Sequence, residues 1–153
     1  MGRALTEALL ERGAMKVTRR RDPETLAALR ERHGSRLVAL RSDVTNAGQV
    51  AEAGRQATDV DLLFNNAGAF EPTELTGETI VDVARREMEV NYFGAPRMLR
   101  GFADTLSRRG GVIVHVGSAA GLSNVPLQPT YSASKAAQHS LTQPPARCWR
   151  PGA

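Results

Sequence analysis

Residues 60–68 read VDLLFNNAG, and they give the clearest indication of the fold. Its first five residues are mostly apolar and predict a short buried strand, and the NNAG that follows predicts a turn out of that strand. A second apolar run, at residues 111–116, predicts a comparable strand that also ends in a turn of small residues. Strands that are apolar throughout are typical of parallel sheets covered by helices on both faces.

Helical patterns separate the predicted strands along the chain. Apolar residues at helical spacing give the helices, and Gly13, Gly34 and the capping residue Asn46 give some of their limits. The expected order is a helix at 3–12, a strand at 15–18, a helix at 22–33, a strand at 36–41, a helix at 46–57, a strand at 60–64, one long helix at 79–108 bent near Gly94-Ala95-Pro96, a strand at 111–116 and a helix at 131–143. This alternation predicts an α/β fold with a parallel sheet.

The composition indicates one soluble globular domain. Hydrophobic residues make up 41% of the 153 residues and charged residues 24%. No apolar run approaches the roughly 20 residues of a membrane span, and no apolar signal region follows Met1, so a cytoplasmic location is expected. The net charge of +4 is too diffuse to indicate nucleic-acid binding. Neither Cys148 nor any of the three histidines has neighbours typical of a metal site.

Several short motifs occur between residues 43 and 135. They are Asp43-Val44 after one predicted strand, Asn65-Asn66-Ala67-Gly68 after the next, Asn91 in the long helix, Gly117-Ser118 after the following strand, and Tyr131-Ser132-Ala133-Ser134-Lys135 at the start of a helix. In order, spacing and structural context they resemble the short-chain dehydrogenase/reductase family. The spacing of the tyrosine and the lysine alone occurs by chance in many proteins, but the joint pattern does not. The resemblance implies a nicotinamide-dependent oxidoreductase that interconverts a carbonyl and an alcohol.

The residue types of the last motif suit an acid/base. Tyr131 and Lys135 stand four residues apart on one helix, so they share a face, and an ammonium near the phenol favours its ionised form. Tyr131 can then exchange a proton with a carbonyl oxygen that the Ser118 hydroxyl holds in place. The resemblance adds that Lys135 grips the nicotinamide ribose and that Asn91 binds a water that passes protons to Lys135. The predicted catalytic residues are therefore Asn91, Ser118, Tyr131 and Lys135.

The resemblance also implies a cofactor site. Asp43 would accept a hydrogen bond from the adenine amine while Val44 covers the ring, and the alternative for Asp43 is a turn aspartate at the end of a strand. Arg21 ends a basic run at the position that would accept a 2′-phosphate, so NADP(H) is favoured over NAD(H). Gly2 matches the last glycine of a phosphate-binding turn. The predicted cofactor-binding residues are Gly2, Arg21, Asp43, Val44, Asn65, Ala67, Gly68, Tyr131 and Lys135.

Both ends of the chain depart from the family pattern. The family's first strand and Gly-rich turn are not found before the first helix, and Pro144-Pro145 breaks the last one. We therefore expect an incomplete Rossmann-type doubly wound parallel sheet that lacks the first strand and the C-terminal strands, with a partial domain at 1–143 and an aberrant Pro/Arg-rich tail at 144–153. In the strand order 3-2-1-4-5-6 the first strand is central, so its loss leaves two strands without a neighbour. Codons for 144–152 read one base out of phase can spell an amphipathic helix, which leads to the hypothesis of a single-base deletion near Gln143.

The expected function is reversible, NADP(H)-dependent reduction of a small-molecule carbonyl to an alcohol. The apolar segment 121–129 suggests a modestly hydrophobic substrate. No nucleic-acid partner and no membrane association are expected, and the resemblance implies a homo-oligomer formed through the helices that hold Asn91 and Lys135. Two alternatives stand beside this function. One is a non-catalytic fragment or relic of such an enzyme, and the more remote one is a basic binding module.

Overall fold

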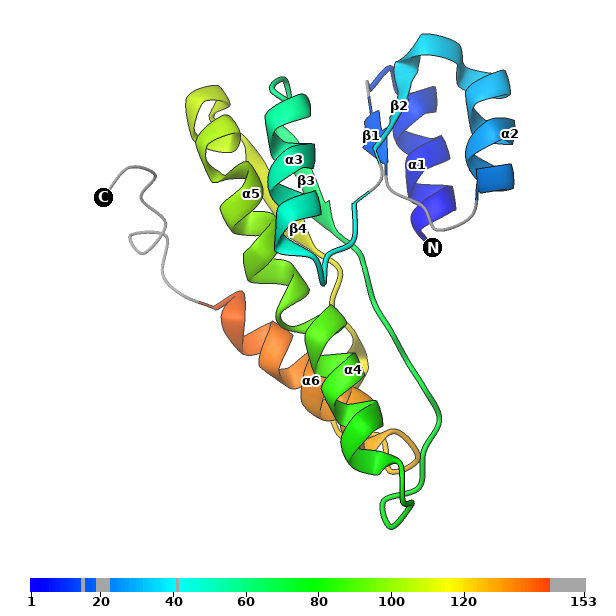
Figure 1. Cartoon of the computed structure of the whole chain (residues 1–153), viewed down its shortest axis with the longest axis vertical. Coiled ribbons are helices and arrows are strands. Elements are labelled where there is room, and N and C mark those ends of the chain that lie inside the picture. The colour runs from blue at the N-terminus through cyan, green and yellow to red at the C-terminus, as the bar shows by residue number, and fades with distance from the viewer. Residues whose placement is uncertain (15, 19–22, 41, 144–153) are drawn as a thin grey trace.

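The computed structural model of the chain describes residues 1–14, 16–18, 23–40 and 42–143. The predictions for Arg21 and for the tail at 144–153 lie outside the described residues. Strands and helices alternate along most of the chain, as the sequence predicts. The strands form parallel pairs, and helices lie beside each pair (Figure 1). The elements are α1 (Gly2–Glu11), β1 (Lys16–Thr18), α2 (Pro23–His33), η1 (Gly34–Arg36), β2 (Leu37–Ala39), α3 (Ala47–Gln56), β3 (Leu62–Asn65), α4 (Ile80–Asn91), α5 (Gly94–Arg109), β4 (Val112–His115), η2 (Ala119–Gly121) and α6 (Pro129–Leu141).

The prediction of one long helix at 79–108 is wrong, because the structure has two helices there. α4 ends at Asn91 and α5 begins at Gly94. Pro96 stands in the first turn of α5, where its missing N–H has no intrahelical partner to lose. Gly94 meets Val44, and a Cβ at Gly94 would lie 2.9 Å from Val44 Cγ2. The break therefore lets the chain fold closely onto the segment that follows β2.

The strands form two separate parallel pairs. β1 pairs with β2 in the register Lys16 to Leu37, and β3 pairs with β4 in the register Leu62 to Val112. Both pairs agree with the predicted parallel sheet, and no strand among the described residues joins one pair to the other. In the doubly wound order 3-2-1-4, β1, β2 and β3 correspond to strands 2, 3 and 4. The place between β1 and β3 therefore belongs to strand 1 of the family. The structure thus confirms the expected incomplete sheet.

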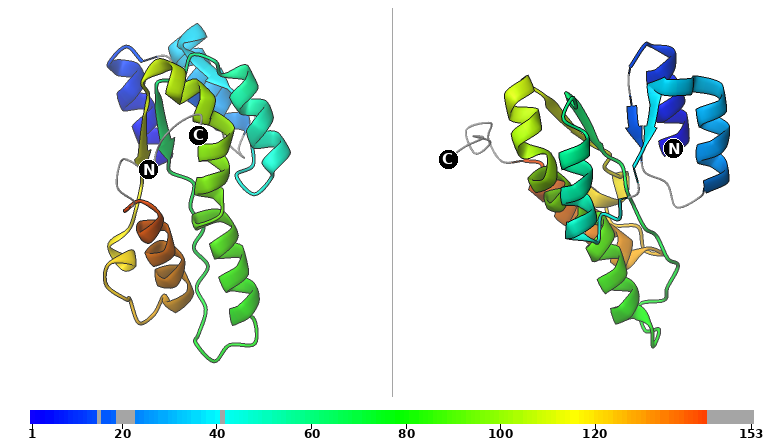
Figure 2. Two further views of the ribbon diagram at one scale, coloured as in Figure 1. Left: turned by 90° about the vertical axis from the view of Figure 1, so that its left-hand side faces the viewer. Right: turned by 45° about the horizontal axis from the view of Figure 1, so that its top comes forward.

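Each strand pair has its own hydrophobic core. Leu10 of α1, Leu29 of α2 and Leu37 of β2 bury one another beside the first pair. The second pair packs against α3 and α5 through a larger cluster made of Ala53, Ala57, Leu63, Phe102 and Leu106. The turned views show α4 and α6 side by side, extending away from the β3–β4 pair (Figure 2). The chain is therefore built as two small packed units and an arm of two helices.

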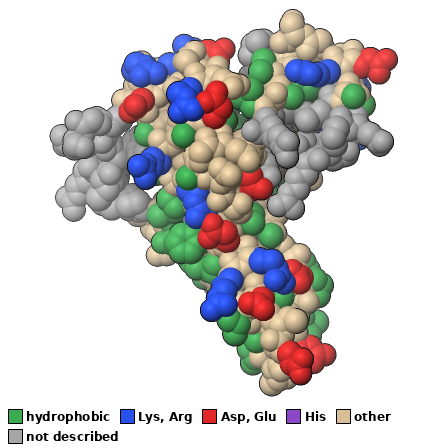
Figure 3. All heavy atoms as spheres, in the orientation of Figure 1, with side chains coloured by type: hydrophobic (Ala, Val, Ile, Leu, Met, Phe, Trp, Pro, Cys, Tyr) green, Lys and Arg blue, Asp and Glu red, His purple; other side chains and the backbone are tan. Residues whose placement is uncertain are grey.

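The arm made of α4 and α6 carries charges of both signs. Figure 3 shows acidic and basic side chains next to one another on it, and Arg86 Nη2 lies 2.8 Å from Glu71 Oε1. This face therefore presents no field of a single sign. Among the described residues, no helix is both long enough and apolar enough to cross a membrane.

Candidate active site

Tyr131 and Lys135 lie one turn apart on α6, as their spacing predicts. Lys135 is buried, and its Nζ is 6.0 Å from the centre of the Tyr131 ring. The same ammonium donates hydrogen bonds to the Val116 carbonyl oxygen at 3.2 Å and to Gln138 Oε1 at 2.9 Å. Burial lowers the pKa of Lys135, because it penalises the charged form. The two neutral acceptors thus hold the ammonium in place without neutralising its charge.

Asn91 joins α4, α6 and the segment that follows β3. It is fully buried at the end of α4, and its Oδ1 accepts from the Ala69 N–H at 2.8 Å. Its Nδ2 donates to the Ala69 carbonyl oxygen and to Ser134 Oγ, each at 2.8 Å. These three bonds fix the turn after β3 against the helix that carries Tyr131. The water relay that the resemblance implies for Asn91 stays a prediction.

Gly68 lies at the point where these groups meet. A Cβ at Gly68 would be 3.5 Å from Asn91 Oδ1 and 3.8 Å from Lys135 Nζ, so both side chains are immediate neighbours of its backbone. A larger side chain would extend into the space between them. The structure therefore brings together four residues from three predicted motifs: Gly68, Asn91, Tyr131 and Lys135.

Ser118 caps the short helix η2 and lies three residues after the end of β4. Its Oγ accepts a hydrogen bond from the Ala120 N–H at 3.2 Å, which leaves the hydroxyl hydrogen available to donate. Gly121, at the other end of η2, presses against α6, since a Cβ there would lie 2.7 Å from the Lys135 carbonyl oxygen. This close approach sets the Ser118 turn against the helix of Tyr131 and Lys135.

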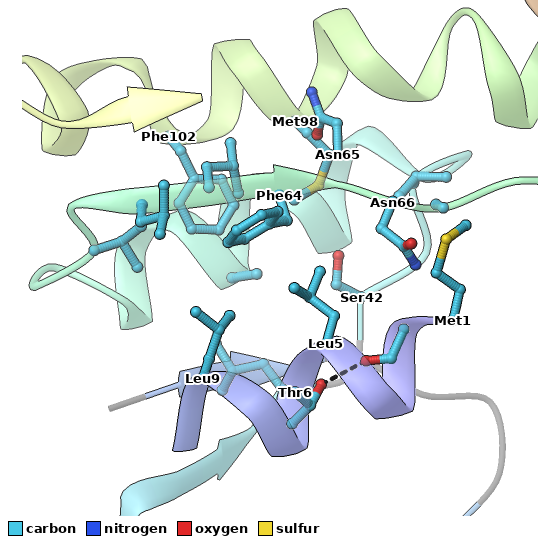
Figure 4. Close-up of a pocket in the computed structure, with 18 of the residues that line it drawn as sticks. Met1, Leu5, Thr6, Leu9, Ser42, Phe64, Asn65, Asn66, Met98 and Phe102 are labelled. Atoms are coloured by element: carbon cyan, nitrogen blue, oxygen red, sulfur yellow. Dashed lines mark hydrogen bonds between the residues drawn. The ribbon is translucent and has the colours of Figure 1, made fainter. Parts of the chain in front are cut away.

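A cavity of about 650 Å³ separates the two strand pairs, between α1 and β2 on one side and β3 and α5 on the other (Figure 4). Leu5 and Leu9 of α1 face Phe64 and Phe102 across it, which makes this part apolar. The other part is polar and is lined by most of the residues predicted to bind the cofactor. These are Gly2, Asp43, Val44, Asn65, Ala67 and Gly68.

The polar part of the cavity fits a ligand rich in hydrogen-bonding groups. Ser42 Oγ, Asn65 Oδ1 and Asn66 Oδ1 are buried in its wall, and none of them has a hydrogen-bond partner in the described structure. The N-terminus of α1 has no side-chain cap, so its amide groups are available to an anion. A Cβ at Gly2 would lie 2.9 Å from Asn66 Nδ2, so the start of α1 closely approaches the Asn66 side chain. A dinucleotide could therefore lie along Gly2 and the NNAG turn.

Asp43 has the contacts of a turn aspartate as well as a place in the cavity wall. Its Oδ1 accepts from the Thr45 N–H at 3.0 Å and from Thr45 Oγ1 at 2.8 Å, and its backbone N–H donates to Gln49 Oε1. Both roles that the sequence allows are thus compatible with its position, and the contact with adenine stays a prediction.

Sequence reasoning missed four polar or aromatic side chains near the site. Ser42 and Asn66 are adjacent to predicted residues, but only the fold shows that Ser42 Oγ and Asn66 Oδ1 are buried without hydrogen-bond partners in the described structure. Glu87 lies one helical turn before Asn91, and this spacing could have indicated that both side chains face the same side of α4. Phe70 contacts Tyr131, with ring centres 5.4 Å apart, and nothing in the sequence indicates this contact.

Comparison with known proteins gives a consistent result. The sequence profile described as short chain dehydrogenase matches residues 1–151. A short chain dehydrogenase from Burkholderia cenocepacia J2315, solved in complex with NADP, is 42% identical with a TM-score of 0.84, over 93% of this chain and 59% of that one. A short chain dehydrogenase/reductase from Burkholderia phymatum, solved in complex with NAD, is 32% identical with a TM-score of 0.84, over 93% of this chain and 53% of that one.

Among the curated relatives, human 17-beta-hydroxysteroid dehydrogenase type 1 is 37% identical over 112 residues, which is 70% of this chain and 33% of the relative. The 3beta-hydroxysteroid dehydrogenase 2 of Eggerthella lenta is 30% identical over 154 residues, or 94% of this chain and 58% of the relative. This chain therefore spans between 33% and 58% of the length of these two relatives. From its profile match, its fold and the geometry of its site, the chain belongs to the short-chain dehydrogenase/reductase family of oxidoreductases.

Proposed function

We propose that this protein catalyses the reversible reduction of a small-molecule carbonyl to an alcohol, with Tyr131 as the acid/base. The observation that carries the proposal is the placement of Lys135 Nζ, buried 6.0 Å from the Tyr131 ring and beside the backbone of Gly68. A cation held by neutral acceptors stabilises a phenolate that forms next to it. This is what an acid/base tyrosine requires at the moment it loses its proton.

The proposed chemistry assigns a role to each residue of the site. A nicotinamide cofactor, when bound, supplies or accepts the hydride. Tyr131 donates its phenolic proton to the carbonyl oxygen, and the Ser118 hydroxyl donates a hydrogen bond to the same oxygen. Lys135 stabilises the phenolate that remains, while Val116 and Gln138 keep its ammonium oriented. In the direction of oxidation the same proton returns to Tyr131.

We further propose that NADP(H) is preferred over NAD(H). The support comes from the sequence: Arg21 follows the segment that corresponds to the second strand of the family, where an arginine can pair with a 2′-phosphate. The solved relatives include complexes with NADP and with NAD, so both cofactors belong in the test. An Arg21→Ser variant is expected to lose affinity for NADPH and to keep its affinity for NADH.

The test of the proposed function is Tyr131→Phe, which removes only the phenolic oxygen. Loss of general acid/base catalysis is expected to lower kcat about 10² to 10⁴-fold, while the Kd for NADPH changes little. The measurement is NADPH oxidation with a panel of neutral aldehydes and ketones, together with a binding titration. The matched control is Tyr92→Phe, because Tyr92 is the other tyrosine of the chain and stacks edgewise on Phe93 instead.

A specific observation also favours the second candidate, a non-catalytic relic. The strand edges that face the cavity have no neighbouring strand among the described residues, and unpaired edges of this kind favour aggregation over a stable fold. If the wild-type chain unfolds without cooperativity and turns over no substrate, the relic is the correct description. Turnover that Tyr131→Phe does not reduce would contradict the role of the tyrosine.

A further inference from the structure

Phe70 is a half-exposed aromatic residue beside the proposed acid/base. It is 48% exposed, and its ring meets the Tyr131 ring edge to face, with centres 5.4 Å apart and planes at 72°. Edge-to-face pairs of this kind are favourable beyond the area they bury. One part of the Phe70 ring therefore contacts the tyrosine, while the exposed part of the ring is open to a ligand.

Two buried side chains of α4 hold the backbone on either side of Phe70. Asn91 binds both the N–H and the carbonyl oxygen of Ala69, and Glu87 Oε1 accepts from the Glu71 N–H at 3.0 Å. Glu87 is 1% exposed, and its second oxygen has no hydrogen-bond partner in the described structure. The hydrogen bond from the Glu71 N–H therefore fixes this part of the loop against α4. The position of Phe70 is thus held by both neighbours.

Further apolar side chains lie on two loops, one that follows Phe70 in the sequence and one that precedes α6. The segments 72–75 and 126–127 enclose a second cavity of about 440 Å³, lined by Pro72, Thr73, Glu74, Leu75, Pro126 and Leu127. Leu75 and Leu127 are largely exposed, at 71% and 84%. Leu127 lies four residues before Tyr131, and its loop is tied to α6 by a hydrogen bond from the Val125 N–H to Ser132 Oγ at 3.2 Å. The loop that carries Leu127 is therefore held against the helix of the proposed acid/base.

From this arrangement we propose that Phe70 determines substrate specificity and that Glu87 is its positioning residue. The inference rests on the proposed function and names its substrate class: neutral carbonyl compounds with a flat apolar ring next to the carbonyl carbon. The carbonyl oxygen meets Tyr131, so the substituent at the carbon falls on the open part of the Phe70 ring. The rest of an extended substrate lies between Leu75 and Leu127. Glu74 in the same lining disfavours an anionic substituent.

The experiment compares methyl naphthyl ketone with acetone, in wild type and in Phe70→Ala. Equilibrium binding is followed by ligand-observed NMR in the presence of NADP+, and kcat/KM is measured with NADPH. We expect Phe70→Ala to weaken binding and kcat/KM for the naphthyl ketone about tenfold, the loss of one aromatic contact, while the values for acetone change less than about twofold. The matched control is Phe93→Ala, since Phe93 is 44% exposed and packs on Tyr92 and Arg97.

The outcomes separate the inference from the proposed function. Binding of the naphthyl ketone that depends on Phe70, with no turnover of any carbonyl, supports the inference and overturns the function. If Phe70→Ala lowers kcat/KM equally for both ketones, or lowers it for neither, the inference about Phe70 is overturned and the proposed function is not affected. Failure of the wild type to bind the naphthyl ketone overturns the inference whatever the turnover.

Glu87→Gln tests the positioning role, because glutamine keeps the shape and is a weaker acceptor for the Glu71 N–H. We expect a higher KM for the naphthyl ketone, an unchanged kcat and an unchanged KM for acetone. A merely structural role would instead lower the Tm and affect both ketones together, and that result would overturn the assignment of Glu87.

Discussion

At the residue scale, His115 links the end of β4 to Asn65 at the end of β3, with Nδ1 and Nδ2 3.3 Å apart. Burial lowers the pKa of His115 below its ordinary value of 6.5. Between that lowered pKa and 6.5, the unfolded chain therefore binds more protons than the folded one. The free energy of unfolding should fall as pH decreases through this window, and His115→Gln should flatten the fall. Denaturant titrations from about pH 8 to pH 5 measure it.

The control for this experiment is His139→Gln, which replaces an exposed histidine of α6. An equal flattening in both variants would show that the fall arises from general charge effects and not from the buried ring. The sequence predicts only that His115 lies in an apolar strand, since its partner Asn65 is 50 residues away.

The proximity of Tyr131 and Lys135 could be predicted, because helix geometry fixes residues four apart. The positions of Phe70 and Glu87 could not be predicted from the sequence. They depend on how a loop meets a helix 16 residues further along the chain, as in the bond between Glu71 and Glu87. No local pattern encodes such a contact.

At the element scale, α3 and α5 pack closely through two glycines. A Cβ at Gly54 would collide with the Gly101 carbonyl oxygen, and a Cβ at Gly101 would lie 2.7 Å from Val50 Cγ1. Gly54→Ala should therefore lower the free energy of unfolding by about 1–3 kcal/mol, the usual effect of overpacking. Gly48→Ala, on the exposed start of α3, places its Cβ 3.4 Å from Asn46 Oδ1 and should leave stability unchanged or raise it by up to about 1 kcal/mol.

Urea titrations of both variants measure the difference. A similar loss in both would mean that helix propensity, and not the contact between α3 and α5, decides the effect.

A close contact of a glycine also explains why the helix at 79–108 was predicted wrongly. Apolar spacing continues through residues 92 and 93, but the fit of Gly94 against Val44 decides where α5 begins, and this contact joins residues 50 positions apart.

At the scale of the whole molecule, the cavity divides the fold into two units that the proposed cofactor site joins. Gly2 comes from the first unit, the NNAG turn comes from the second, and Asp43 and Val44 lie on the connection. The order and direction of the strands could be predicted, because apolar strands alternating with helices favour a parallel sheet. The size of the cavity could not be predicted from the sequence, because it depends on the position of α1, which no described strand separates from β3.

Hydrogen exchange should reveal this division and its closure by a ligand. Without ligand, we expect amides of α1 and β2 to exchange faster than those of β3 and β4, because the first unit has the smaller core among the side chains that the structure describes. NADP+ reaches residues of both units, so it should slow exchange in α1 and at 42–46 as well as at 66–71. Nicotinamide mononucleotide, the control, lacks the adenosine half and should slow only 66–71 and 131–135. Uniform exchange across both units without ligand, or protection by NADP+ confined to 66–71, would contradict a cofactor site that bridges the cavity.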